Sequence, residues 1–119
     1  MFIFLLAWYL DISLGMEDGA IPNEKITASS WTTENPPHRA RLDSNYLGGG
    51  AWCPSKAVGS YLQIDLGTLH HVTALATQGN PSGDEDYVME YTIKHSQDGY
   101  NWNCYEEGGK IKVRLLGLK

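Results

Sequence analysis

Residues 61–67 read YLQIDLG, and this stretch decides the fold class. Its apolar residues alternate with polar ones and a glycine follows, which predicts a half-buried β-strand that ends in a turn. Residues 26–30 (ITASS) alternate in the same way, and residues 72–77 (VTALAT) predict a strand buried on both sides for part of its length. Residues 87–96 predict one further strand. Short strands without a long helix indicate an antiparallel β-sandwich or barrel.

Turn and loop residues separate these strands. Residues 97–100 (QDGY) predict a hairpin turn, because Asp-Gly tolerates the positive φ that such a turn requires. Residues 31–47 contain consecutive prolines and no periodicity, so we expect an ordered loop rather than a helix. Residues 78–86 (QGNPSGDED) form a second polar loop, and residues 102–105 and 110–116 read as later strands.

Composition narrows the functional class. The 119 residues suffice for one domain, with 42% hydrophobic and 19% charged residues, as in ordinary globular proteins. The net charge is -5, and the nine Lys and Arg residues are scattered without forming a basic stripe. Nucleic acid is therefore not an expected partner.

The amino terminus is apolar. Residues 1–10 read MFIFLLAWYL, which is too short to span a bilayer but fits the apolar part of a secretory signal peptide. Residues 1–15 are accordingly predicted to be a signal peptide or apolar leader, although a positively charged start is missing. A first β-strand, or a consequence of where the sequence was started, are the alternatives.

Catalytic and metal-binding patterns are missing from the sequence. Cys53 and Cys104 lack the CxxC spacing of a zinc or redox site, and His70-His71 has no further ligand at suitable spacing. No GxSxG, HExxH or phosphate-binding glycine loop occurs. A glycosidase pair such as Asp65 and Glu90 is discounted because both lie in ordinary strands. We therefore expect no enzyme and no metal site.

Several segments, taken in order, resemble one family. The stretch from Leu14 to Val113 is similar to the discoidin, or coagulation factor 5/8 type C, domain through ITASSW, RARLDS, GAWCP, YLQIDLG, VTALATQG and YTIKHSQDGYNW. The resemblance implies a jelly-roll-like antiparallel β-sandwich of the galactose-binding-like kind that binds ligands and does not catalyse. It also implies an extracellular location, in a secreted or cell-surface protein. Ligands in the family include phospholipid headgroups, glycans, collagen and other proteins.

The sequence departs from the family pattern at both ends. The family usually has a Cys shortly before the position of residues 13–16, and it continues past the strand that GGKIKV matches to a closing Cys. Residues 16–119 are therefore expected to form a partial discoidin domain, incomplete at the C-terminus and poorly stable. A truncated fragment without independent function is one alternative to a binding module. In the family the Cys of the GAWCP motif pairs with the closing one, so we predict that Cys53 is not bonded to Cys104.

The resemblance also implies a ligand site on loops at one end of the sandwich. Binding groups collect on loops because loops vary without disturbing the core. An aromatic ring beside amide, hydroxyl and carboxylate groups suits a glycan or a protein ligand. The predicted ligand-binding residues are Trp31, Thr32, Thr33, Glu34, Asn35, His38, Asn80, Ser82, Asp84, Glu85, Asp86 and Tyr87.

Several residues of this region also have structural interpretations that compete with ligand binding. Trp31 is the better ligand candidate, although a wedge in the sandwich is the competing interpretation. Three adjacent carboxylates at residues 84–86 would be repelled by an anionic leaflet, which disfavours a membrane lipid ligand. These carboxylates also lack the spacing of a calcium loop, so no cofactor is expected and calcium stays the weaker alternative. Structural roles are predicted for Trp52, Cys53, Trp102, and for Arg41 and Asp43 as a loop-bracing ion pair.

Overall fold

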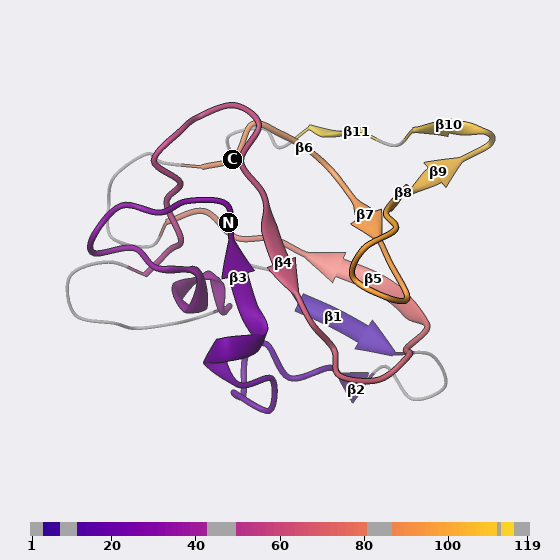
Figure 1. The fold of residues 1–119 in the computed structure, drawn as a ribbon, viewed down its shortest axis with the longest axis horizontal. Coiled ribbons are helices and arrows are strands. Elements are labelled where there is room, and N and C mark those ends of the chain that lie inside the picture. The colour runs from indigo at the N-terminus through magenta and orange to yellow at the C-terminus, as the bar shows by residue number, and fades with distance from the viewer. Residues whose placement is uncertain (1–3, 8–11, 43–49, 81–86, 112, 116–119) are drawn as a thin grey trace. The chain divides into compact units, whose positions relative to one another are not determined.

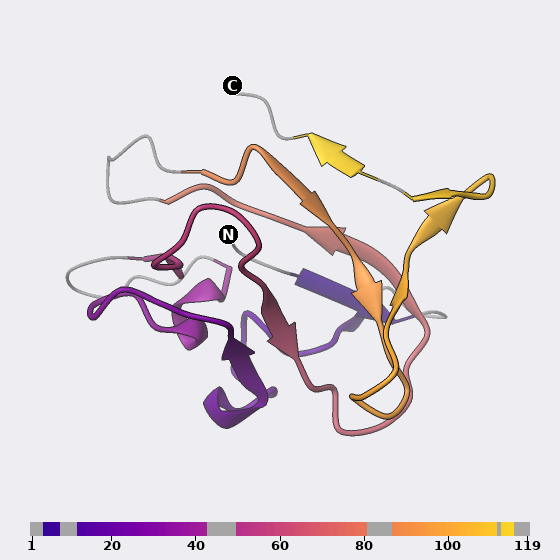
Figure 2. The same ribbon diagram turned by 45° about the horizontal axis from the view of Figure 1, so that its top comes forward.

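The computed structural model describes residues 4–7, 12–42, 50–80, 87–111 and 113–115. Regular structure in these ranges consists of short strands and two single-turn 3-10 helices, in agreement with the predicted all-β class (Figures 1 and 2). The chain divides into two compact units, residues 1–86 and 87–119. Within the described ranges, no helix has the length and apolar character needed to cross a membrane.

The first unit contains a three-stranded antiparallel sheet in the order β2-β1-β5. Its strands are β1 (Phe4–Ala7), β2 (Ile12–Ser13) and β5 (Val72–Ala76). Leu5 lies opposite Leu75, and the register shifts between Leu6 and Ala7. Part of the apolar amino terminus therefore has the conformation of a strand, and its removal as a signal peptide stays a prediction.

A second, two-stranded sheet of this unit pairs β3 (Ile26–Ala28) with β4 (Leu62–Ile64). The 3-10 helix η1 (Asn23–Lys25) leads directly into β3. Hydrogen bonds extend the pairing beyond both strands, because Ser29 N donates to Tyr61 O at 3.0 Å and Asp65 N donates to Lys25 O at 2.9 Å. Both strands lie where the alternation predicts them.

The core of the first unit forms around Met16, Ile21 and Ile26, which are 0%, 6% and 3% exposed. Partly buried leucines and an isoleucine pack against them, namely Leu14, Leu62, Ile64, Leu66 and Leu75. Burying a side chain of the size of Met16 stabilises the fold by about 1.5–3 kcal/mol. The alternation in residues 61–67 therefore places Leu62, Ile64 and Leu66 toward this core.

The expected burial of β5 on both faces is wrong. Leu75 is half-buried against the core, whereas the other residues of β5 are exposed, with Val72 at 43%. Alternation along a strand sends neighbouring side chains to opposite faces, so the face that carries Leu75 is the one that packs. The apolar character of residues 72–76 alone does not reveal that one face is open.

Arg41 holds the segment before β3 in place. It is 6% exposed, and its guanidinium donates to Met16 O at 2.9 Å, Ile21 O at 2.6 Å and Asn23 Oδ1 at 2.7 Å, with a longer contact to Gly15 O at 3.5 Å. A planar fork of donors suits several oxygens at once. The described partners of Arg41 are thus carbonyl oxygens, and the predicted ion pair with Asp43 stays a prediction because Asp43 lies outside the described residues.

The described residues of the second unit form three antiparallel strand pairs. β6 (Glu90–Thr92) pairs with β11 (Val113–Leu115), β7 (Lys94–His95) with β8 (Asn103–Cys104), and β9 (Glu106–Glu107) with β10 (Lys110–Ile111). The single strand predicted for residues 87–96 is instead two short ones that change partner at Ile93. Ile93 O accepts a bond from Tyr105 N at 2.8 Å, so the backbone pairing passes from one neighbour to the next at this residue.

The loop between β7 and β8 is organised by Asp98. Its carboxylate accepts hydrogen bonds from the backbone amides of Asn101 and Tyr100, both at 2.8 Å, and from Asn101 Nδ2 and Ser96 Oγ. These donors, the Asn101 amide first, hold the pKa of the Asp98 carboxyl far below its usual range. Gly99 has a φ of 78°, as the Asp-Gly sequence predicts, and Trp102 Nε1 donates to Gly99 O at 3.2 Å.

No disulfide joins Cys53 and Cys104, which are both partly buried thiols.

Candidate functional site

The candidate loop begins at the end of β3, where the indole of Trp52 fixes it. Trp52 is 6% exposed, and its Nε1 donates to Ser30 O at 3.0 Å. Ser55 N donates to Ser30 Oγ at 3.2 Å. The predicted core position of Trp52 agrees with this burial, and its one polar atom is satisfied by the loop that it supports.

Backbone hydrogen bonds carry the loop further. Thr32 N donates to Cys53 O at 2.9 Å, and Cys53 N donates to Asn35 O at 3.3 Å. Within the loop, Asn35 N donates to Thr32 O at 2.9 Å and Asn35 Nδ2 donates to Thr32 Oγ1 at 3.1 Å. Residues 32–35 therefore form a closed turn that is laid against the segment around Cys53.

The side chains at the tip of this turn point outward. Trp31 is 49% exposed, and Thr33 and Glu34 are exposed as well. This half-exposed indole offers a flat apolar face to a ligand. Binding there would cost little conformational entropy, because hydrogen bonds already fix the backbone of the loop. Trp31 is thus exposed, in contrast to the wedge interpretation of this residue.

The loop ends in a single 3-10 turn, η2 (Pro37–Ala40). The expectation of no helix in this region needs correction, since Pro36 and Pro37 preset the φ values with which such a turn begins. Pro37 and Ala40 are buried, and Arg41 follows them directly. The loop of residues 31–36 is therefore held at its start by Trp52 and Cys53, and it ends at η2, which is partly buried.

His38 lies on η2 and is half-buried. Burial lowers the pKa of its imidazole below the ordinary value, and the nearby charges of Arg39 and Arg41 lower it further. These effects favour the neutral form of the ring, which has one hydrogen-bond donor and one acceptor.

The second predicted segment is described only in part. Asn80 is half-buried in the first unit, and Tyr87, 37% exposed, belongs to the second. Ser82, Asp84, Glu85 and Asp86 lie outside the described residues, as does Asp43. The structure therefore places Trp31, Thr32, Thr33, Glu34, Asn35 and His38 on one loop, and the ligand-binding role of the whole predicted set stays a prediction. Across the residues that are described, no three His, Cys, Asp or Glu side chains gather in a group that could hold a metal ion.

Sequence reasoning missed the serines that brace the loop. Ser29 Oγ accepts a bond from Tyr61 N at 3.0 Å, next to the bond between Ser30 Oγ and Ser55. Tandem serines after a strand favour such side-chain to backbone bonds, and this was the available signal. Through Ser29, which precedes Trp31 by two residues, the loop is bonded to Tyr61, a residue that is 58% exposed.

Comparison with known proteins gives a consistent result. The profile of the F5/8 type C domain matches residues 25–115. Rat lactadherin is 40% identical over 84% of this chain, human epithelial discoidin domain-containing receptor 1 is 39% identical over 80%, and pig coagulation factor V is 41% identical over 87%. The chain spans 25%, 11% and 5% of the lengths of these relatives.

The match confirms the predicted resemblance and the β-sandwich class, because the discoidin fold is a β-sandwich and the described residues are strand-rich. The predicted extracellular location is confirmed by the same relatives, which are secreted or cell-surface proteins. Domains of this kind act as binding modules and are not enzymes.

Proposed function

Because the chain belongs to the F5/8 type C (discoidin) domain family, we propose that it is a non-catalytic recognition module that binds a glycan or protein ligand through the loop of residues 31–38. The observation that carries this proposal is the anchored loop that presents the half-exposed indole of Trp31. Trp52 and Cys53 hold its backbone from below.

The chemistry of this loop favours a polar ligand with at least one flat face. An indole can stack on the apolar face of a sugar ring or on a peptide side chain, while neighbouring hydroxyl, amide and imidazole groups supply hydrogen bonds. Thr33 and Glu34 are exposed beside Trp31, and partial burial lowers the pKa of His38, which favours its neutral form. Glu34 adds a carboxylate, which favours a neutral or basic ligand over an anionic one.

The second part of the proposed site is the segment that contains Asn80, Ser82, Asp84, Glu85, Asp86 and Tyr87. Its three adjacent carboxylates suit basic groups of a protein ligand and would be repelled by an anionic membrane surface. We therefore propose a glycan or a protein as the ligand, and the binding test has to distinguish these ligands from a phospholipid surface.

The test is a binding screen of the full chain against glycans, collagens and vesicles that contain anionic phospholipid. We expect binding to a glycan or protein, and loss of most of this binding in Trp31→Ala and Asp84→Ala, each checked for retained folding. Removing a central aromatic contact typically costs 2 kcal/mol or more of binding energy, about a thirtyfold loss of affinity.

His70→Ala serves as the matched control. His70 is exposed, and its ring contacts Thr68 Oγ1 at 3.1 Å in the turn between β4 and β5. The control should bind as the unchanged protein does. The site is misplaced if Trp31→Ala and Asp84→Ala both bind normally while His70→Ala binds weakly. Vesicle binding alone, abolished by Trp31→Ala, would replace the proposed ligand class with a membrane surface.

A further inference from the structure

Two Asp-Gly dipeptides occupy exposed turns, Asp18-Gly19 in the first unit and Asp98-Gly99 in the second. Both glycines have positive φ, 80° and 78°. In both turns the aspartate carboxylate accepts a bond from the amide two residues later, Ala20 N at 3.0 Å and Tyr100 N at 2.8 Å. The two dipeptides thus share their sequence and their turn geometry, so a difference in reactivity must come from their surroundings.

An Asp-Gly dipeptide can rearrange without an enzyme. The glycine nitrogen attacks Cγ of the aspartate, a C–N bond forms, and the carboxyl hydroxyl leaves as water to give a cyclic imide. Water then opens the imide at one of its two carbonyls and restores aspartate or produces isoaspartate, whose main chain is one methylene longer. Glycine favours the attack because it has no Cβ to obstruct it. Water is the only co-reactant, and nothing is oxidised or reduced.

At Asp98 both reacting groups are engaged. The carboxylate, which must be protonated for its hydroxyl to leave, is held ionised by the amides of Asn101 and Tyr100 and by Ser96 Oγ. The attacking nitrogen, Gly99 N, donates to Ser96 Oγ at 2.9 Å. Reaction at this dipeptide therefore requires the loop to open first.

At Asp18 the surroundings are open. Residues 17–20 are exposed and a Cβ placed on Gly19 would meet no atom within 4 Å, but the same holds for the turn at Gly99, so the two turns differ in their hydrogen bonds and not in open space. The hydrogen bond described for the Asp18 carboxylate is donated by Ala20 N and does not involve Gly19 N, the attacking nitrogen. Imide formation here therefore disrupts one described bond to the carboxylate, whereas at Asp98 it disrupts the bonds from Ser96, Tyr100 and Asn101.

We propose that Asp18-Gly19 is a site of spontaneous isoaspartate formation in the folded protein and that Asp98-Gly99 is protected from the same reaction. The site lies in a turn that Ile21 N closes by donating to Gly15 O at 3.0 Å. The carbonyls of Met16 and Ile21, on either side of the dipeptide, are bonded by Arg41. An added methylene between them changes the length of the chain that Arg41 clamps, so the modified protein is less stable.

The experiment ages the full chain at body temperature and mildly acidic pH in water labelled with heavy oxygen. Peptide mapping by mass spectrometry locates isoaspartate, and the incorporated label reports each opening of the imide. We expect isoaspartate at residue 18 to exceed that at residue 98 by about tenfold or more, since the latter needs local opening. In urea-unfolded protein the two sites should react at similar rates. Equal accumulation at both sites in the folded protein, or none at residue 18, would overturn the proposal.

Asp18→Glu is the control variant, because a glutamate would have to form a larger ring. It should gain no isoaspartate at residue 18 and should keep its melting temperature on ageing, whereas the aged unchanged protein should melt at a lower temperature than fresh protein. If the aged protein contains isoaspartate at residue 18 and melts as before, the coupling to Arg41 is wrong.

Discussion

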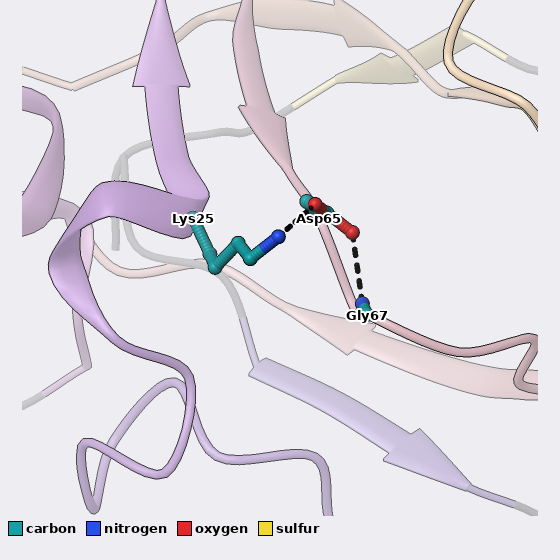
Figure 3. A network of polar contacts seen from close by, with 3 residues as sticks. All are labelled: Lys25, Asp65 and Gly67. Carbon is teal, nitrogen blue, oxygen red and sulfur yellow. Dashed lines mark hydrogen bonds and ion pairs between the residues drawn. The ribbon is translucent and has the colours of Figure 1, made fainter.

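Lys25 and Asp65 are joined twice, once through side chains and once through the backbone. Figure 3 shows the side-chain contact together with the bond between Asp65 and Gly67. Lys25 Nζ lies 2.6 Å from Asp65 Oδ2, and Asp65 N donates to Lys25 O at 2.9 Å. Asp65 Oδ1 also accepts a bond from Gly67 N at 2.8 Å, so the carboxylate connects the start of β3 to the turn after β4. The side chains are 43% and 52% exposed, which makes the ion pair the weakest part of this arrangement.

We expect Asp65→Ala to lower the melting temperature more than Lys25→Met does. Lys25→Met removes the ion pair alone, whereas Asp65→Ala also leaves the Gly67 amide without its acceptor. The difference should persist in high salt, because screening weakens the exposed ion pair and not the backbone bond. Thermal melts of both variants at low and high ionic strength measure this, and identical losses would contradict it.

The contribution of the ion pair should depend on pH at both extremes. The hydrogen bond with Lys25, and then that from Gly67, lowers the pKa of Asp65, so this stabilisation exists above the unfolded pKa of about 3.9 and is lost as pH falls through the folded value. The pKa of Lys25 is raised, chiefly by its hydrogen bond to Asp65, so its share exists below about 10.4 and is lost as pH rises through the folded value. Denaturant titrations across pH should show the difference between unchanged protein and Lys25→Met only within this window.

Replacing Arg41 should be far more damaging than replacing an exposed cation. Arg41→Ala leaves the carbonyls of Met16 and Ile21 without their donor in the core, and each buried unsatisfied group costs about 1–3 kcal/mol. Arg41→Lys should also destabilise, because a single ammonium cannot reproduce a fork that bonds separated oxygens. Urea unfolding measures both, with exposed Lys56→Ala as the neutral control. An Arg41→Ala protein as stable as this control would refute the clamp.

Gly15 is required by the close approach of the chain to itself. Its φ is 105°, and a Cβ would lie 2.6 Å from Ala20 Cβ and 2.9 Å from Ile21 N. Gly15→Ala should therefore cost more than the roughly 1–3 kcal/mol of an unfavourable backbone conformation alone. Gly59→Ala is the matched control, because Gly59 has a φ of 79° and open space around it. The two variants should differ in urea midpoint, and equal midpoints would show that the turn relaxes without loss.

The loop between β7 and β8 should hold its structure at unusually low pH. The pKa of Asp98 is depressed by the amides of Asn101 and Tyr100, so its stabilisation is present above about 3.9 and is lost only as pH falls through the lower folded value. The amide resonances of Tyr100 and Asn101 should stay unchanged through pH 4 and move well below it. In Asp98→Ala these resonances should lose their dispersion at every pH, and an Asp98→Ala loop that keeps its native shifts would contradict this role.

Local sequence patterns correctly predicted the strands that bury one face, because apolar and polar residues alternate in them. The alternation in residues 61–67 and 26–30 located β4 and β3, and the apolar ring of Trp52 beside glycines was correctly assigned to the core. Such features follow from the side-chain period of a strand and from the size of an indole, which both operate within a few residues.

Hydrogen-bond partners that are far apart in sequence could not be predicted from such local patterns. The pattern around Arg41 pointed to a partner nearby, Asp43, which lies outside the described residues, and did not indicate the described partners, which lie 18 to 26 residues away. The division of residues 87–96 into β6 and β7 likewise depends on Tyr105, which bonds Ile93. A sequence shows which side chains can donate hydrogen bonds. It does not show which backbone carbonyl accepts them, because every residue has one.

The bonds that support residues 31–35 have an evolutionary consequence. They involve the main chain of Thr32, Asn35 and Cys53, the indole of Trp52 and the hydroxyl of Ser30, whereas the side chains of Trp31, Thr33 and Glu34 carry none of the described loop bonds. Those positions can mutate while the backbone beneath them keeps its course. On the proposed function, we therefore expect that these three positions can be substituted to change ligand specificity without redesign of the scaffold.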